Sequence, residues 1–180
     1  EGSAVELCDA CKQQSRGLNC RGMAIVLSEL YMALGHPARF MTCQSKAYNT
    51  DPDCHVICEV WSQQLGKWLW MDPSFAAFVS DGQGHLLSIA EVRERLRTDK
   101  PLVLNEDANW NHEVKQTKED YLDNYMAKNL YYLSCYLESG ANTEDGTHTY
   151  VTIQPKGQSF PVGGVVTHDD AWFWQAPNAQ

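Results

Sequence analysis

Three side chains in this sequence have the chemistry of a thiol nucleophile and its base: Cys20, His55 and Asp72. A cysteine attacks a carbonyl carbon as the thiolate, so it needs a neighbouring base and surroundings that favour negative charge. A histidine can hold the thiol proton, and a carboxylate can orient the imidazole and support its protonated form. If the fold brings these three side chains together, they form a Cys–His–Asp triad.

The segment 17–35 is predicted to form one buried helix that begins at Cys20. Asn19 is a favourable N-cap, because its side-chain oxygen can accept a hydrogen bond from an amide of the first turn. Apolar residues then recur at helical spacing, and Gly35 suits a left-handed C-terminal cap. Cys20 would therefore lie at the positive end of the helix dipole, beside unpaired N–H groups, where the pKa of a thiol is lowered.

Two neighbouring strands are predicted to carry the other two members. One opens with His55 and runs to Trp61, and the next runs over 66–72 and ends on Asp72. The short polar break between them is typical of a hairpin loop, so the two strands are expected to be antiparallel neighbours. This arrangement would set His55 and Asp72 side by side. A further strand is predicted over 38–44, between the helix and the histidine strand.

Further candidates would bind the substrate or stabilise charge. The backbone N–H of Cys20 is the first candidate for an oxyanion donor, and the side chain of Gln14 is the second. Trp110 and His112 lie together in a polar loop, where an exposed aromatic ring could contact a substrate. His112 is also the alternative to His55 as the base. Each of these three side chains could equally be a solvated loop residue.

Composition limits the class of protein. The chain has 180 residues, 43% of them apolar and 21% charged, which is typical of one globular domain. Its net charge of −9 argues against a nucleic-acid partner or an anionic membrane surface. No apolar run approaches the roughly 20 residues that span a bilayer. The first residues lack the parts of a secretion signal, and since the chain does not begin with Met, its compartment stays open.

The seven cysteines are an odd number, so at least one is expected to be free, and Cys20 is the natural candidate. Cys8 and Cys11 form a lone C-x-x-C, which could be a redox pair or half a zinc site. No second pair completes a tetrahedral set, so neither a metal nor another cofactor is expected. The cysteines predicted to be small core residues are Cys43, Cys58 and Cys135.

The C-terminal part of the chain is predicted to add helices and strands to this arrangement. Ser88 and Glu91 form an S-x-x-E capping box that opens a helix over about 89–97. Apolar spacing predicts a second long amphipathic helix from about Lys118 to Leu133. Strands are predicted near 148–154 and 165–167.

The three blocks around Cys20, His55 and Asp72 together resemble the transglutaminase-like superfamily of papain-type folds. Residues 19–39 resemble its nucleophile helix and the strand that follows. Residues 55–61 resemble its histidine strand, and residues 68–74 its aspartate strand. The order Cys, His, Asp is also that of the superfamily, and the intervals suit a compact, bacterial-type member. The resemblance covers about residues 14–80.

The resemblance implies an α+β fold: an N-terminal nucleophile helix packed on an antiparallel sheet, with a cleft at the amino end of the helix. We expect a single domain over 1–180, with a core over about 14–80 and a helical and β extension over about 81–180. The superfamily includes thiol peptidases, deglycosylating amidases, acyl-transferring transglutaminases and non-catalytic modules.

The expected function is thiol-dependent acyl chemistry on a peptide or carboxamide bond. A hydrolase of the peptidase or amidase type is the preferred class. Its partner would be a peptide or protein substrate, glycosylated ones included. Two alternatives remain open from the sequence. One is a protein-glutamine acyltransferase, and the other is a non-catalytic module that binds a peptide or glycan.

Overall fold

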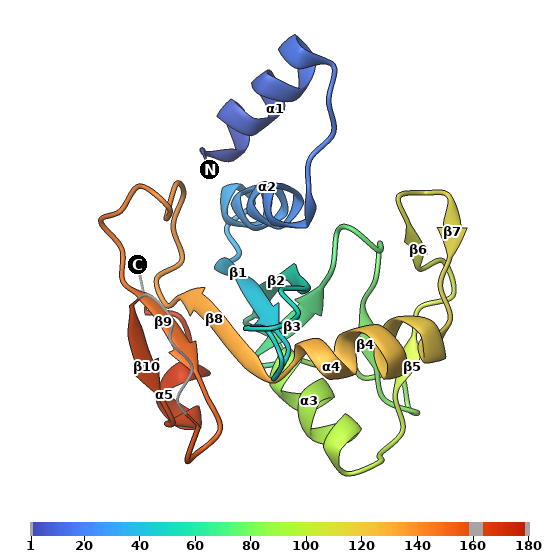
Figure 1. Ribbon diagram of the computed structural model, residues 1–180. Coiled ribbons are helices and arrows are strands. Elements are labelled where there is room, and N and C mark those ends of the chain that lie inside the picture. Colours follow the sequence, from blue (N-terminus) through green and yellow to red (C-terminus); the bar gives the residue numbers. More distant parts are fainter. Residues whose placement is uncertain (1, 159–163, 179–180) are drawn as a thin grey trace.

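A six-stranded sheet is the centre of the fold in the computed structural model, which describes residues 2–158 and 164–178. The strand order is β10-β9-β8-β1-β2-β3, and all neighbours are antiparallel except β9 and β10 (Figure 1). The strands of this sheet are β1 (Ala38–Gln44), β2 (Cys54–Ser62), β3 (Lys67–Met71), β8 (Tyr132–Tyr136), β9 (Tyr150–Ile153) and β10 (Val165–Thr167).

Shorter strands and the helices surround this sheet. The short strands pair as β4 (Val79–Ser80) with β5 (Val103–Leu104), and β6 (Asn109–Trp110) with β7 (Val114–Lys115). The α-helices are α1 (Ala4–Gln14), α2 (Cys20–Ala33), α3 (Ile89–Arg97), α4 (Ala127–Asn129) and α5 (Asp170–Phe173). A π-helix, η1 (Glu119–Met126), runs directly into α4. The described residues therefore form a mixed α+β structure, as predicted.

Helices cover both faces of the sheet because successive side chains of a strand point to opposite sides. On one face, α2 packs against Phe40, Val56 and Cys58, and α1 packs on α2 (Figure 1). On the other face, α3 and η1 pack against a larger cluster that includes Met41 and Trp70. The predicted alternation along β1 is confirmed, since Phe40 and Met41 belong to clusters on opposite faces.

Several local predictions are confirmed. Helix α2 begins at Cys20 after an Asn19 N-cap, and Gly35 beyond its end has a φ of 85°. Strand β1 has the predicted bounds, and β2 and β3 form the predicted hairpin. The S-x-x-E capping box opens α3. The cysteines predicted to lie in the core are all fully buried: Cys43, Cys58 and Cys135.

The predicted helix from Lys118 to Leu133 is wrong in its type and in its end. Residues 119–126 form a π-helix, the helical part stops at Asn129, and Leu133 lies in strand β8. The physical reason is pairing in the sheet: Leu133 is opposite Cys43 of β1, which would otherwise be an unpaired edge strand. This pairing outweighs the helical preference of the apolar spacing.

Candidate active site

Cys20 is the first residue of α2, and local hydrogen bonds fix it there. The Asn19 side chain accepts a hydrogen bond from the Gly22 amide at 2.8 Å, and its backbone oxygen accepts from the Met23 amide at 3.0 Å. The thiol therefore lies at the positive end of the helix dipole. Cys20 is only partly buried.

His55 and Asp72 come together on the face of the sheet opposite α2. The two side chains are buried, and His55 Nε2 lies 2.7 Å from Asp72 Oδ2. Asp72 follows β3 directly, and its backbone forms two hydrogen bonds with Ala77. Its other oxygen, Oδ1, accepts hydrogen bonds from the amides of Ser74 and Phe75 at 2.9 and 3.4 Å. These contacts hold the carboxylate against the imidazole.

The Cys20 thiol lies close enough to the His55 ring for hydrogen-bond and charge interactions to shift the pKa of both groups, and His55 in turn pairs with Asp72. The structure therefore brings the three predicted side chains together. Burial by itself would raise the pKa of the Cys20 thiol. The hydrogen bond and charge of His55, together with the backbone amides of Val56 and Arg21, outweigh burial, and the net pKa is lowered.

The pKa of His55 is raised from 6.5 to about 9. Burial alone would lower this pKa, because it disfavours the charged ring. The charge of Asp72 and its hydrogen bond act in the opposite direction, and the hydrogen bond with Cys20 adds to them. Both shifts favour the ion pair of a Cys20 thiolate and a His55 imidazolium, and the thiolate is the form of cysteine that attacks a carbonyl.

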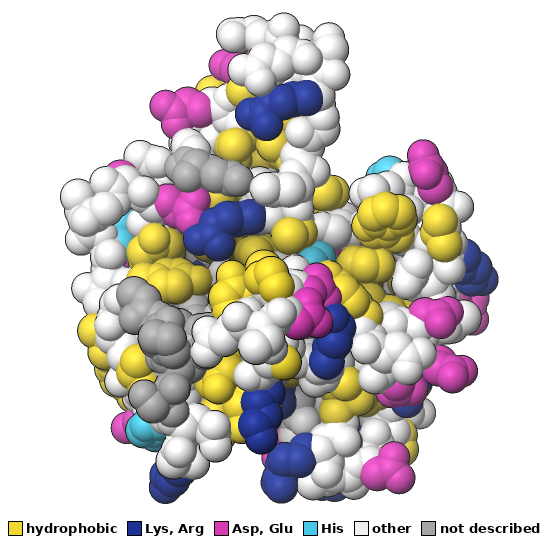
Figure 2. Space-filling view, in the orientation of Figure 1, with side chains coloured by type: hydrophobic (Ala, Val, Ile, Leu, Met, Phe, Trp, Pro, Cys, Tyr) yellow, Lys and Arg dark blue, Asp and Glu magenta, His cyan; other side chains and the backbone are white. Residues whose placement is uncertain are grey.

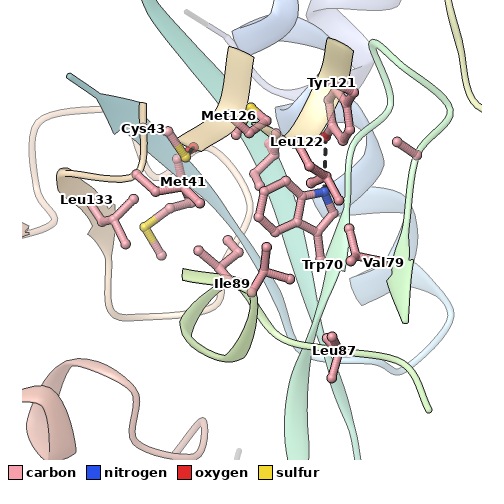
Figure 3. Close-up of a cluster of buried hydrophobic side chains, with 14 of the residues drawn as sticks. Met41, Cys43, Trp70, Val79, Leu87, Ile89, Tyr121, Leu122, Met126 and Leu133 are labelled. Carbon is pink, nitrogen blue, oxygen red and sulfur yellow. Dashed lines mark hydrogen bonds between the residues drawn. The ribbon is translucent and has the colours of Figure 1, made fainter. Parts of the chain in front are cut away.

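The π-helix contributes a further contact to the triad. The Tyr121 hydroxyl donates to Asp72 Oδ2 at 2.6 Å. The indole N–H of Trp70 in turn donates to the Tyr121 oxygen at 3.1 Å (Figure 3). Burial and the nearby Asp72 charge raise the pKa of Tyr121 well above its usual value, so the hydroxyl keeps its proton. The sequence analysis placed Tyr121 only as one apolar position of a helix, and its local pattern held no further signal.

Two more aromatic rings enclose the imidazole. The ring centroids of Phe75 and Tyr125 lie 5.4 and 5.5 Å from that of His55. Burial, followed by nearby acidic and thiol groups, raises the pKa of Tyr125, which is therefore a neutral neighbour. The rings shield the imidazole from water and so strengthen its interactions with Asp72 and Cys20. Both residues were missed as site residues by the sequence analysis.

The secondary candidates occupy different positions around this centre. Gln14 is exposed at the end of α1, and no contact joins it to Cys20 among those recorded for residues 2–158 and 164–178. Trp110 is 47% exposed in the β6–β7 hairpin, and His112 is exposed in the same turn. The hairpin lies beside the site, since the Asn109 amide bonds to the Phe75 carbonyl at 2.8 Å. The histidine that contacts Cys20 is His55 rather than His112.

A cavity of about 470 Å³ lies next to the residues that precede Cys20. It lies between α1 and the segment that leads into α2, and Asn19 is among its lining residues. In the space-filling view, the outline is hollowed between the projecting N-terminal helix and the β6–β7 hairpin, with hydrophobic side chains along the hollow (Figure 2). A peptide that lay in this hollow would pass the amino end of α2.

All seven cysteines are free thiols. Among residues 2–158 and 164–178, no group of three His, Cys, Asp or Glu side chains is placed to hold a metal ion. Within the same described residues, no helix combines the length and the apolar character that crossing a bilayer requires.

Residues 3–73 match the family model of the transglutaminase-like superfamily. The matched region contains Cys20, His55 and Asp72, and the superfamily includes cysteine-dependent hydrolases and acyltransferases. Comparisons with curated proteins and with solved structures gave no match. The predicted resemblance is thereby confirmed over residues 3–73, which match the model of the transglutaminase-like superfamily.

Proposed function

We propose that the protein catalyses thiol-dependent acyl chemistry on a peptide or carboxamide bond, with water as the acceptor. In this proposal Cys20 is the nucleophile, His55 the proton carrier and Asp72 the group that orients and supports the imidazolium. The observation that carries the proposal is the continuous set of contacts from a partly exposed thiol of lowered pKa through His55 to Asp72.

In the first half of the reaction, the Cys20 thiolate forms a bond to the carbonyl carbon of the substrate. The negative charge that develops on the carbonyl oxygen is stabilised by the backbone N–H of Cys20 at the positive end of α2, with Gln14 as a further candidate donor. His55 then gives its proton to the leaving amine as the carbon–nitrogen bond breaks. The product is a thioester on Cys20 and a free amine.

In the second half, neutral His55 takes a proton from water as the hydroxide attacks the thioester carbonyl. The carbon–sulfur bond breaks, the acid leaves, and the Cys20 thiolate and His55 imidazolium are regenerated. Asp72 holds the imidazole in one orientation throughout. We propose water as the acceptor because it requires no binding site beyond that of the acyl donor. The substrate would be a peptide or protein, and glycosylated substrates are included.

The test is cleavage of a library of peptide amides, analysed by mass spectrometry, by the wild-type protein and by Cys20→Ala. We expect wild-type turnover of at least one library member and loss of that turnover in Cys20→Ala. Cys11→Ala is the matched control, because it removes another partly buried thiol near a helix, and it should keep its activity. Unchanged turnover in Cys20→Ala would remove Cys20 from the mechanism.

The same experiment separates the proposal from its alternatives when a primary amine is added to the reaction. A hydrolase gives the carboxylic acid as the main product, whereas an acyltransferase gives the new amide. A binding module would retain peptides without turnover. Its Cys20 would also react with iodoacetamide only near the ordinary thiol pKa of about 8.5.

A further inference from the structure

Tyr121 lies outside the region that matches the superfamily, yet its hydroxyl contacts the carboxylate of the triad. We infer that Tyr121 is a positioning residue: its hydroxyl holds Asp72 in the orientation that supports the His55 imidazolium, and through it the Cys20 thiolate. The inference deepens the proposed function and rests on it for the catalytic meaning of the triad.

The hydrogen bonds around the carboxylate carry this inference. Asp72 Oδ2 accepts from His55 at 2.7 Å and from Tyr121 at 2.6 Å, while Oδ1 accepts from two backbone amides. Because Trp70 donates to the Tyr121 oxygen, the hydroxyl proton points toward Asp72 and not away from it (Figure 3). The Tyr121 hydroxyl is thus a directed donor to the oxygen that faces His55.

The conformation of η1 gives a second reason. A π-helix of eight residues is rare, and π turns occur frequently at functional sites. Here the wide turns bring the rings of Tyr121 and Tyr125 onto Phe75, with centroid distances of 4.8 and 5.7 Å. Packing of this kind needs only the rings, so it does not account for a hydroxyl placed on a buried carboxylate.

Tyr121 acts through Asp72 and not on the substrate. Its side chain is 0% exposed, so it cannot touch a bound peptide. A hydrogen bond to a charged group inside a protein is stronger than one at the surface. Loss of the hydroxyl would therefore loosen Asp72 and weaken its support for the imidazolium.

The test is the rate at which iodoacetamide alkylates Cys20, followed by mass spectrometry of the Cys20 peptide over a range of pH. In Tyr121→Phe, we expect the rate at pH 6 to fall about tenfold. A rise of about one unit in the pKa of the Cys20 thiol would remove about nine-tenths of the thiolate at that pH. At pH 10 the rate should equal that of the wild type, because the Cys20 thiol is then ionised in both proteins. The titratable groups that face this centre are Asp72, Cys20, Cys43, Asp53, Cys54 and Tyr125, and the substitution leaves all of them in place.

Three outcomes would overturn the inference. One is a rate that matches the wild type at pH 6, and another is an equal loss at both pH values, which would indicate a structural role. The third is a faster reaction at pH 6. It would mean that the hydroxyl mainly weakens the effect of the Asp72 charge on His55. Tyr131→Phe is the matched control, since it removes the hydroxyl of a half-buried tyrosine outside the triad and should leave the profile unchanged.

A double-mutant cycle tests whether Tyr121 acts through Asp72. In an Asp72→Asn background, Tyr121→Phe should have no further effect on the rate at pH 6, whereas independent effects would multiply. Thermal unfolding of each variant shows that the protein measured is folded. If Tyr121→Phe does not fold, Trp70→Phe removes the donor to the Tyr121 oxygen. It should then give a smaller loss at pH 6 with the same pH dependence, and an unchanged profile would contradict the inference.

Failure of this inference and failure of the proposed function are distinguishable. A wild-type protein that cleaves no amide, but whose Cys20 reacts at pH 6, would contradict the proposed function and leave the role of Tyr121 measurable. On any peptide that the wild type cleaves, Tyr121→Phe should lower kcat and leave KM within about twofold, because a residue that acts only through Asp72 makes no contact with bound substrate. A rise in KM with constant kcat would contradict a positioning role.

Discussion

Strand β2 carries two buried pairs of opposite charge on the same face, four residues apart. His55 pairs with Asp72 at 2.7 Å, and Glu59 pairs with Arg39 of β1 at 2.6 Å. All four side chains are buried. The pairs differ in what the cation meets on its other side. The His55 ring meets a partly exposed thiol, whereas the Arg39 guanidinium meets aromatic rings and a backbone carbonyl.

The Arg39 pair is enclosed by the C-terminal segment. The guanidinium lies 4.5 Å from the Trp68 ring and donates to the Phe173 carbonyl of α5 at 3.3 Å. Glu59 is 0% exposed, and its Oε2 has no hydrogen-bond partner among the described residues. This pair ties α5 to the sheet and has no route by which a substrate proton could enter or leave.

Burial of a charge pair does not by itself indicate a catalytic site. Both pairs carry pKa shifts: the pKa of His55 is raised to about 9, and the pKa values of Arg39 and Glu59 are also raised. The contacts of the Arg39 pair join β1, β2 and α5. What distinguishes the His55 pair is its contact with the partly exposed Cys20 thiol.

The largest effect is expected when the structural pair is broken. Arg39→Met leaves Glu59 buried without a counter-charge, which should lower the free energy of unfolding by about 4 kcal/mol in urea titrations. The double variant Arg39→Met/Glu59→Gln should recover at least half of this loss. Alkylation of Cys20 by folded Arg39→Met should match the wild type. An equal loss in the double variant would show that packing of the arginine, and not its charge, was the main contribution.

The pH dependence of stability sharpens the comparison. The raised pKa of His55 contributes stability that is present below pH 6.5 and lost as the pH rises toward about 9. The lowered pKa of Cys20 acts in the opposite direction, because the unfolded thiol keeps its proton longer than the folded one. The two contributions offset each other in the wild type.

Removing the thiol should therefore expose the contribution of His55. From pH 6.5 to 8.5, the free energy of unfolding of Cys20→Ala should fall by about 1 kcal/mol more than that of the wild type. The matched variant Cys11→Ala should follow the wild type. The Arg39→Met/Glu59→Gln protein, which keeps both Cys20 and His55, should also follow the wild-type slope. Parallel curves for Cys20→Ala and wild type would mean that His55 is not protonated in the fold.

The smallest effect is expected from a surface pair beside the same strand. Lys128 pairs with Asp53, just before β2, and the two side chains are 43% and 39% exposed. Exposed pairs contribute little, so Lys128→Ala should lower the free energy of unfolding by less than about 1 kcal/mol. Added salt should remove most of that difference. Arg97→Ala, which breaks the exposed Arg97–Glu94 pair, is the control and should behave alike.

Local sequence was enough to predict the elements that position the triad. The cap at Asn19 and the hairpin between His55 and Asp72 depend on neighbours within a few residues, and the structure reproduces both. The three-block resemblance also selected the superfamily that matches residues 3–73. These predictions succeeded because capping and strand alternation are determined by short-range geometry.

Two contacts between distant segments were not predicted. Tyr121 meets Asp72 across 49 residues, and Arg39 meets the Phe173 carbonyl across 134. Charged residues within the apolar strands β1 and β2 were a visible signal for the buried Arg39–Glu59 pair. No comparable signal marked Tyr121, because the helical pattern of residues 118–133 is as compatible with an α-helix as with a π-helix. Tertiary contacts decide between the two conformations.

Because η1 is a π-helix, the number of residues before Tyr121 also determines the geometry of the site. A π turn holds about one residue more than an α turn, so excision of a single residue ahead of Tyr121 would let the segment relax into ordinary α geometry. All later side chains of the segment would rotate by about 100° around the axis. Such a deletion would move the Tyr121 hydroxyl away from the Asp72 carboxylate without changing the sequence of residues 3–73.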